Sequence, residues 1–204
     1  MEIKEKIVAG AGNMFTKYGV RSVTMDDVAR ELSISKKTIY QHFKDKDEIV
    51  TVATAAHMEM EKREFREIAE TAVDAIDEIA RLSTCVRKNV AELNPSLLFD
   101  LQKYHRKAWE VYMEFKNEFI MNSIKHKLHR GISEGYYRDE IDPEMLAILR
   151  VEQVQMAFDE KIFPRTKFDF REVQMQMFDH FVNGLVTKKG RILYDEYIKT
   201  QITN

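Results

Sequence analysis

Apolar side chains recur every three or four residues along most of the chain, which is the period of an amphipathic helix. The chain has only 7 Gly and 3 Pro, so few residues interrupt these stretches. The sequence therefore predicts an all-α protein. The expected helices cover residues 3–18, 25–32, 36–43, a long segment from about residue 46, 72–90, 144–161 and 171–186, with a short final helix ending near residue 198.

Residues 23–47, VTMDDVARELSISKKTIYQHFKDKD, contain two short expected helices separated by a tight turn. Thr24 stands where the first helix needs an N-cap, and Asp27 lies three residues later, as in a capping box. Ser33-Ile34 forms the turn. Asp142-Pro143 has the same start signal before the helix over 144–161, with Asp142 as the N-cap and Pro143 at N1.

The second short helix is expected to show a polar face to the outside. Ser35 is its N-cap, and Ile39 and Phe43, four residues apart, hold it to the core. Two lysines at the leading end, followed by hydroxyl and amide groups, suit a helix that enters a major groove with its N-terminus first. The outward residues are Lys36, Lys37, Thr38, Tyr40, Gln41 and Lys44.

Residues 38–46, TIYQHFKDK, resemble the DNA-binding half of the TetR family of bacterial transcriptional regulators. The resemblance extends back over residues 15–24 and forward over 44–50, and it is close over about the first quarter of the chain. Ser33 departs from it, because the family often has Gly there. If the backbone at this position needs a positive φ, Ser is strained where Gly is not.

The resemblance implies a homodimeric regulator, in the first instance a repressor, that binds a near-palindromic double-stranded operator. Its two heads would lie in successive major grooves about 34–36 Å apart. The fold it implies is an N-terminal three-helix head with a helix-turn-helix over residues 1–47, joined to a larger helical ligand-binding and dimerisation body over 48–204. It assigns phosphate contacts to Thr38, Tyr40, His42 and Lys46 and base contacts to Lys36, Lys37 and Gln41, and Thr24 and Lys44 complete the expected DNA-binding set.

The stretch 96–119 is rich in aromatic residues with a few polar ones between them. Ligand pockets are apolar with a few polar groups, so this stretch is a candidate wall for a small apolar or amphipathic effector. The alternative is that these side chains only fill a helical core. The candidate ligand-binding residues are Tyr104, His105, Trp109, Tyr112, Met113 and Phe158.

The helices over 144–161 and 171–186 carry more apolar surface than one helix seam needs. Two helices near the C-terminus form a four-helix dimer interface in the family that the chain resembles. We therefore expect these two helices to form the homodimer interface. Gly184 would allow backbones to approach closely there, and burial within one subunit is the alternative.

Composition narrows the class of protein further. The net charge is −2, so basic residues must be concentrated locally, and residues 30–46 hold five Lys or Arg against two acids. The single Cys85 excludes an intramolecular disulfide. No apolar run approaches about 20 residues, and the start does not resemble a secretory leader, so we expect a cytoplasmic protein without a membrane partner.

No enzyme motif is present, and we expect no catalytic residue, cofactor or metal site. His126 and His129 share a helix face, but no further ligand accompanies them. Two other functions remain open. One is a ligand-independent DNA-binding activator or architectural protein. The other is a helical binding module or enzyme that retains the head as a relic.

Overall fold

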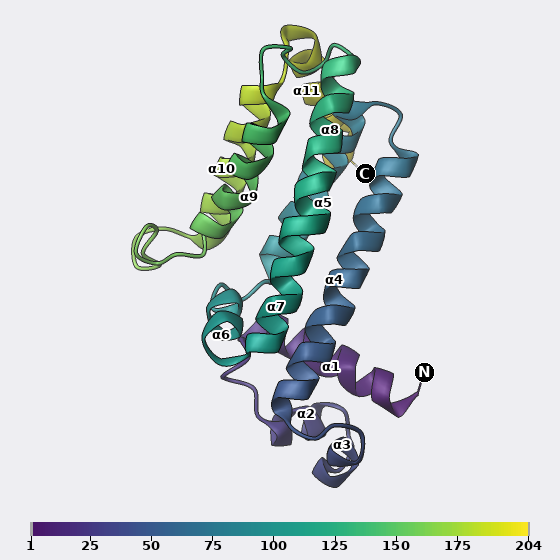
Figure 1. The fold of residues 1–204 in the computed structure, drawn as a ribbon, viewed down its shortest axis with the longest axis vertical. Helices are drawn as coiled ribbons and strands as arrows, with labels where there is room; N and C mark the ends of the chain where they lie inside the picture. Colours follow the sequence, from purple (N-terminus) through teal and green to yellow (C-terminus); the bar gives the residue numbers. More distant parts are fainter. Residues whose placement is uncertain (1, 204) are drawn as a thin grey trace. The chain divides into compact units, whose positions relative to one another are not determined.

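A computed structural model describes residues 2–203, and within this range the backbone forms helices and no β-strand (Figure 1). The one β-type contact recorded there is an antiparallel bridge between Tyr137 and Val186. The predicted all-α class is confirmed. The chain divides into two compact units, residues 1–62 with 92–115 and residues 63–91 with 116–204.

The first unit contains the three N-terminal helices, the start of the long helix α4 and two later helices (Figure 1). Its core consists of side chains that the helical period placed on the inward faces, among them Ile7, Val28, Ile39 and Ile49, all fully buried. The helices are α1 (Ile3–Tyr18), α2 (Met25–Glu31), α3 (Lys36–His42), α4 (Lys46–Thr71), α6 (Leu97–Tyr104) and α7 (Arg106–Glu114).

The predicted helix starts are confirmed. The Asp27 amide donates to Thr24 Oγ1 at 3.2 Å, and the Thr24 amide donates to Asp27 Oδ2 at 2.9 Å, which completes the capping box. The Thr38 amide donates to Ser35 Oγ at 3.0 Å. Each cap satisfies amides that the first turn of a helix leaves without a partner.

Ser33 has a φ of +53°, so the turn between α2 and α3 has a left-handed backbone conformation at this residue. This is the conformation in which Ser is strained and the Gly that is frequent in the family is not. The Ile34 amide donates to Ala29 O at 3.0 Å, and the Ser33 amide donates to Arg30 O at 3.1 Å. These two bonds form a Schellman motif, which ends α2 and turns the chain towards α3. Serine has a Cβ, so its presence here carries a strain of about 1 kcal/mol relative to Gly.

The segment before α6 lies against the end of α1, a contact that the sequence pattern did not predict. The Asn94 amide donates to Thr16 O at 2.7 Å. Gly19 has a φ of +79°, and a Cβ there would lie 2.8 Å from Ser96 Oγ, so only glycine fits. Residues 92–115 thus pack with the first unit, which also contains residues up to 62. The predicted functional division at residue 47 stays a prediction.

The second unit contains the end of α4 and the helices described below, and it has its own core. Fully or almost fully buried side chains such as Ile76, Leu128, Val182 and Leu185 form this core. Its helices are α5 (Ala75–Glu92), the π-helix η1 (Phe115–Ile120), α8 (Met121–Ser133), α9 (Pro143–Met156), α10 (Phe170–Leu185) and α11 (Lys188–Thr203).

Two predictions for helices in this unit were wrong, namely the end of the helix over 144–161 and the length of the final helix. The helix expected over 144–161 ends at Met156, because the chain then enters turns in which Asp159 Oδ1 accepts from the Lys161 amide at 2.8 Å. The final helix is not short, since α11 has 16 residues. The start at Pro143 is confirmed, and the Met145 amide donates to Asp142 Oδ1 at 3.0 Å.

Candidate nucleic-acid interface

Helix α3 presents one polar face to the outside and fixes the opposite face in the core of the first unit. Ile39 and Phe43 are buried. Lys37, Tyr40 and Gln41 are exposed. Because a helix places residues three and four apart on one face, these exposed side chains form a continuous surface one helix wide. That surface has the dimensions of an element that enters a major groove.

Lys36 is also exposed, but its ammonium already has a partner. Its Nζ donates to Asp26 Oδ2 at 2.8 Å, and this hydrogen bond is the main reason that the pKa of Lys36 is raised. Both side chains are exposed, so the pair is open to exchange with an incoming acceptor. Lys36 can therefore exchange Asp26 for another acceptor, and its predicted base contact stays a prediction.

The remaining predicted DNA contacts lie around this face. Lys44 and Thr24 are exposed, while Thr38 and His42 are half-buried. The Thr24 hydroxyl donates to Asp27 Oδ2 at 2.6 Å, and this bond is the main cause that lowers the pKa of Asp27. Thr24 therefore acts first as the cap of α2, and its predicted DNA contact stays a prediction.

Lys46 differs from the other predicted contacts because its ammonium is used inside the first unit. Its Nζ donates to Val20 O and to Val23 O, each at 2.6 Å, and lies 5.9 Å from the centre of the Phe15 ring. Burial lowers its pKa, and the carboxylates of Asp100 and Asp27 oppose this shift. Two of its three N–H groups thus hold the loop between α1 and α2, and the predicted phosphate contact of Lys46 stays a prediction.

Replacing Lys46 by Met is expected to lower the free energy of unfolding by about 2 kcal/mol, since two charge-assisted hydrogen bonds to carbonyls are lost. Urea unfolding followed by circular dichroism measures this. Lys44→Met is the control, because Lys44 is exposed, and we expect it to stay within about 0.5 kcal/mol of the wild type. Equal stability of the two variants would show that Lys46 has no structural role.

Five of the six predicted ligand-binding residues lie in the first unit. Tyr104 is exposed, and the Arg21 guanidinium lies 5.0 Å from the centre of its ring. His105 Nδ1 and Asp47 Oδ1 are 2.8 Å apart. The rings of Trp109 and Tyr112 are 5.3 Å apart, and Met113 is half-buried beside them in the sequence.

Phe158 is the sixth predicted ligand-binding residue, and it belongs to the second unit. Its ring lies 4.7 Å from that of Phe170. The structure therefore does not gather the six side chains within one unit. Their role in ligand binding stays a prediction.

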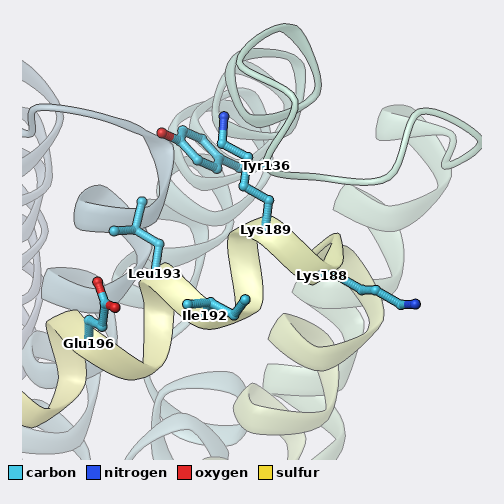
Figure 2. A pocket seen from close by; sticks show the side chains of 6 residues that line it. All are labelled: Tyr136, Lys188, Lys189, Ile192, Leu193 and Glu196. Atoms are coloured by element: carbon cyan, nitrogen blue, oxygen red, sulfur yellow. The ribbon is translucent and has the colours of Figure 1, made fainter.

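The second unit has an open hollow of about 530 Å³ at the start of α11 (Figure 2). None of the six predicted ligand-binding residues lines it. The Lys189 ammonium lies 4.4 Å from the centre of the Tyr136 ring, whereas Figure 2 shows the Lys188 side chain directed away from that ring. The lining residues are Tyr136, Lys188, Lys189, Ile192, Leu193 and Glu196.

Comparison with known families supports the DNA-binding interpretation of the first unit. The sequence model described as "Bacterial regulatory proteins, tetR family" matches residues 7–53, which contain α2 and α3. Residues 7–53 form a DNA-binding domain of the TetR family. The chain is thus a transcriptional regulator with a helix-turn-helix DNA-binding domain, as the resemblance predicted.

Relatives of this chain match most of its length. The uncharacterized HTH-type transcriptional regulator YvaF of Bacillus subtilis (strain 168) is 25% identical over 183 residues, 89% of this chain and 94% of YvaF. A TetR-family regulator from Agrobacterium tumefaciens has a similar fold, with a TM-score of 0.73 at 15% identity, over 90% of this chain and 97% of that one.

A putative transcriptional regulator from Saccharomonospora viridis, whose structure is a complex with choline, also shares the fold. The TM-score is 0.73 at 17% identity, and the match covers 91% of this chain and 98% of that one. Family and fold are thus those of transcriptional regulators.

Sequence reasoning missed one residue that positions the TetR-type head. Asp100 is buried, and its Oδ2 accepts from the Arg21 amide at 3.1 Å, which ties α6 to the loop before α2. The only sequence signal was an acid within an aromatic stretch. Among residues 2–203, no cluster of three or more His, Cys, Asp or Glu has metal-binding geometry. In the same range no helix is both long and apolar enough to span a membrane.

Proposed function

We propose that this TetR-family regulator is a repressor that binds a near-palindromic operator as a homodimer and is released by a small-molecule effector. The observation that carries the proposal is the polar outer face of α3. Lys37, Tyr40 and Gln41 are exposed there, while Ile39 and Phe43 are buried on the other side. A dimer that covers two successive major grooves excludes other proteins from the same DNA, which is how binding becomes repression.

Within this proposal the exposed side chains have two kinds of target. Lys36, Lys37 and Gln41 contact base edges, where Gln pairs with adenine and Lys with guanine. The phosphates are contacted by Thr38, Tyr40, His42, Lys44 and Lys46, and these contacts fix the position of the head without reading sequence. Thr24 joins the phosphate set through the exposed start of α2.

Exposed apolar side chains along α9 support the homodimer. Met145, Ile148, Leu149 and Met156 lie on one face of this helix and are 65%, 53%, 46% and 38% exposed. A soluble protein rarely leaves such a stripe uncovered. On α10 a Cβ added to Gly184 would meet nothing within 4 Å, which leaves room for a second backbone, while the large apolar residues of α10 are mostly buried within the subunit.

Two features support release by a small apolar or amphipathic effector. The regulator from Saccharomonospora viridis, which has a similar fold, is in complex with choline. Helix α4 is continuous from Lys46 to Thr71, so one helix begins next to α3 and ends in the second unit. An effector that binds better to a dimer whose heads do not match the operator spacing shifts the population away from the DNA-bound state.

The test begins with selection of bound fragments from random duplex DNA. On the selected operator we expect Gln41→Ala to reduce affinity at least about 30-fold, since one base contact of about 1–3 kcal/mol is lost in each of the two subunits, about 2–6 kcal/mol in total. Affinity for unrelated DNA should change little.

Lys44→Ala is the matched control for Gln41→Ala. It should weaken operator and unrelated DNA alike and reduce the slope of log affinity against log salt by roughly 2, one phosphate per subunit. Mobility-shift titration at several salt concentrations measures both variants. Selection without any enriched sequence, or identical behaviour of the two variants, would contradict the proposal.

A further inference from the structure

Arg150 is a buried cation in α9 with an unusual environment. It is 6% exposed, and its guanidinium carbon lies 5.0 Å from the centre of the Phe178 ring and 5.7 Å from that of Phe181, both on α10. These aromatic contacts attract the cation but supply no hydrogen-bond acceptor. Among the described residues, no atom accepts a hydrogen bond from its buried Nη1.

Two other cations of the second unit, Lys116 and Arg130, face carboxylates. Lys116 Nζ lies 2.9 Å from Glu152 Oε1, and Arg130 Nη1 lies 3.1 Å from Glu78 Oε2. No such ion pair is recorded for Arg150 within the described part of the chain. Burial alone lowers the pKa of Arg150 to about 10, so the side chain still carries its charge at neutral pH.

An unpaired buried charge is costly, because the protein has removed its water without replacing it. A bound oxyanion would offset this cost by pairing with the charge. Its geometry is suitable, since the N–H groups along the edge of a guanidinium match two oxygens of a carboxylate or phosphate. The rings of Phe178 and Phe181 supply no acceptor, so the buried Nη1 is the place for a hydrogen-bonding partner.

Gln153 supplies a second polar atom without a partner. Its buried Oε1 receives no hydrogen bond from the described residues. Gln153 follows Arg150 by three residues, so the two side chains are neighbours on the surface of α9. A molecule that carries an oxyanion and a nearby hydrogen-bond donor satisfies both atoms.

We infer that the effector is an organic anion, and that its carboxylate or phosphate binds Arg150 between α9 and α10. This inference rests on the effector proposed above and names its chemical class. It places the anionic group in the second unit, on the inward face of α9, opposite the apolar stripe of Met145, Ile148 and Leu149. The apolar remainder of the effector then lies among aromatic and aliphatic side chains, as is usual for ligand sites.

Isothermal titration calorimetry without DNA tests the inference. The probes are octanoate, octyl phosphate, octyltrimethylammonium and 1-octanol, which share one alkyl chain and differ in the head group. We expect at least one of the two anionic probes to bind wild-type protein more tightly than the cationic and neutral ones. Arg150→Met should weaken that binding roughly 10- to 100-fold, as expected for hydrogen bonds to a charged group.

The two anionic probes separate a carboxylate site from a phosphate site. Arg150→Lys keeps the charge but not the planar fork, so an intermediate affinity is expected. Lys116→Met is the control, because it removes a buried cation that already has a carboxylate partner, and it should leave probe affinity unchanged. Without a probe, the urea midpoint of Arg150→Met should equal or exceed that of the wild type, because an unpaired buried charge has been removed.

Four results would overturn the inference. The first is that wild-type protein binds neither anionic probe, and the second is that Arg150→Met leaves probe affinity unchanged. The third is that the urea midpoint of Arg150→Met falls below that of the wild type. The fourth is that the wild type is a dimer and Arg150→Met is a monomer. The last result would mean that a carboxylate of a second copy pairs with Arg150. Binding is measured without DNA, so this inference can be tested separately from the proposed release of the operator. An anion that binds through Arg150 but does not release the operator would contradict the proposed release and not the anion site.

Discussion

Replacing Ile148 by Glu is expected to convert the proposed dimer to monomers and to reduce operator affinity at least about a hundredfold. Ile148 lies in the middle of the exposed apolar stripe of α9. In a two-fold interface each substitution appears twice, so two carboxylates would be buried without partners. A monomer loses the second head, whose binding is favoured by the high effective concentration within a dimer.

Sedimentation equilibrium measures the association state, and mobility shift on the selected operator measures affinity. Ile192→Glu is the matched control, because Ile192 is 64% exposed on α11 and lies outside the predicted interface. We expect it to remain dimeric and to bind the operator normally. If Ile148→Glu stays dimeric, α9 does not form the interface, and if both variants become monomeric, the interface involves α11.

The features that could be predicted from the sequence are those fixed by neighbouring residues. The caps at Thr24, Ser35 and Asp142 depend on a side chain and an amide three positions apart, and all three are present. The strain predicted at Ser33 depends on one φ angle, which is +53°. Such local signals act over one turn of helix, so a single sequence contains them.

The features that could not be predicted depend on residues far apart in the chain. The Arg21 amide and Asp100 are separated by 79 positions, and Lys46 reaches the carbonyl of Val20 across 26. The aromatic stretch indicated apolar burial but not its partner, so the contact of His105 with Asp47 was not expected. Charged residues are usually exposed, which is why burial of Arg150 had no sequence signal.

Replacing Glu78 by Gln is expected to lower the free energy of unfolding by about 3 kcal/mol, because two partly buried cations lose their shared anion. Glu78 is 2% exposed on α5. Its Oε2 accepts from Arg130 Nη1 at 3.1 Å, and its Oε1 lies 3.3 Å from Lys127 Nζ. Glutamine keeps the shape of the side chain, so the loss measures the charge and not a cavity.

The pH dependence of this deficit follows from Lys127. Burial lowers the pKa of Lys127, and Glu78 opposes that shift. A lysine whose folded pKa lies below its unfolded value is easier to bury once it is neutral, so stability is gained as pH rises through the folded pKa. In Glu78→Gln the opposing carboxylate is absent, and we expect the deficit to be smaller at about pH 10 than at neutral pH.

Urea unfolding at both pH values measures the deficit, with Glu140→Gln as the control. Glu140 pairs with Arg138 at 3.0 Å, but both side chains are exposed, so its neutralisation should change stability by less than about 1 kcal/mol at either pH. A deficit in Glu78→Gln that matches this control would mean that water, and not Glu78, stabilises Lys127 and Arg130. A large deficit that is independent of pH would assign the loss to Arg130 alone, since its guanidinium keeps its proton throughout this range.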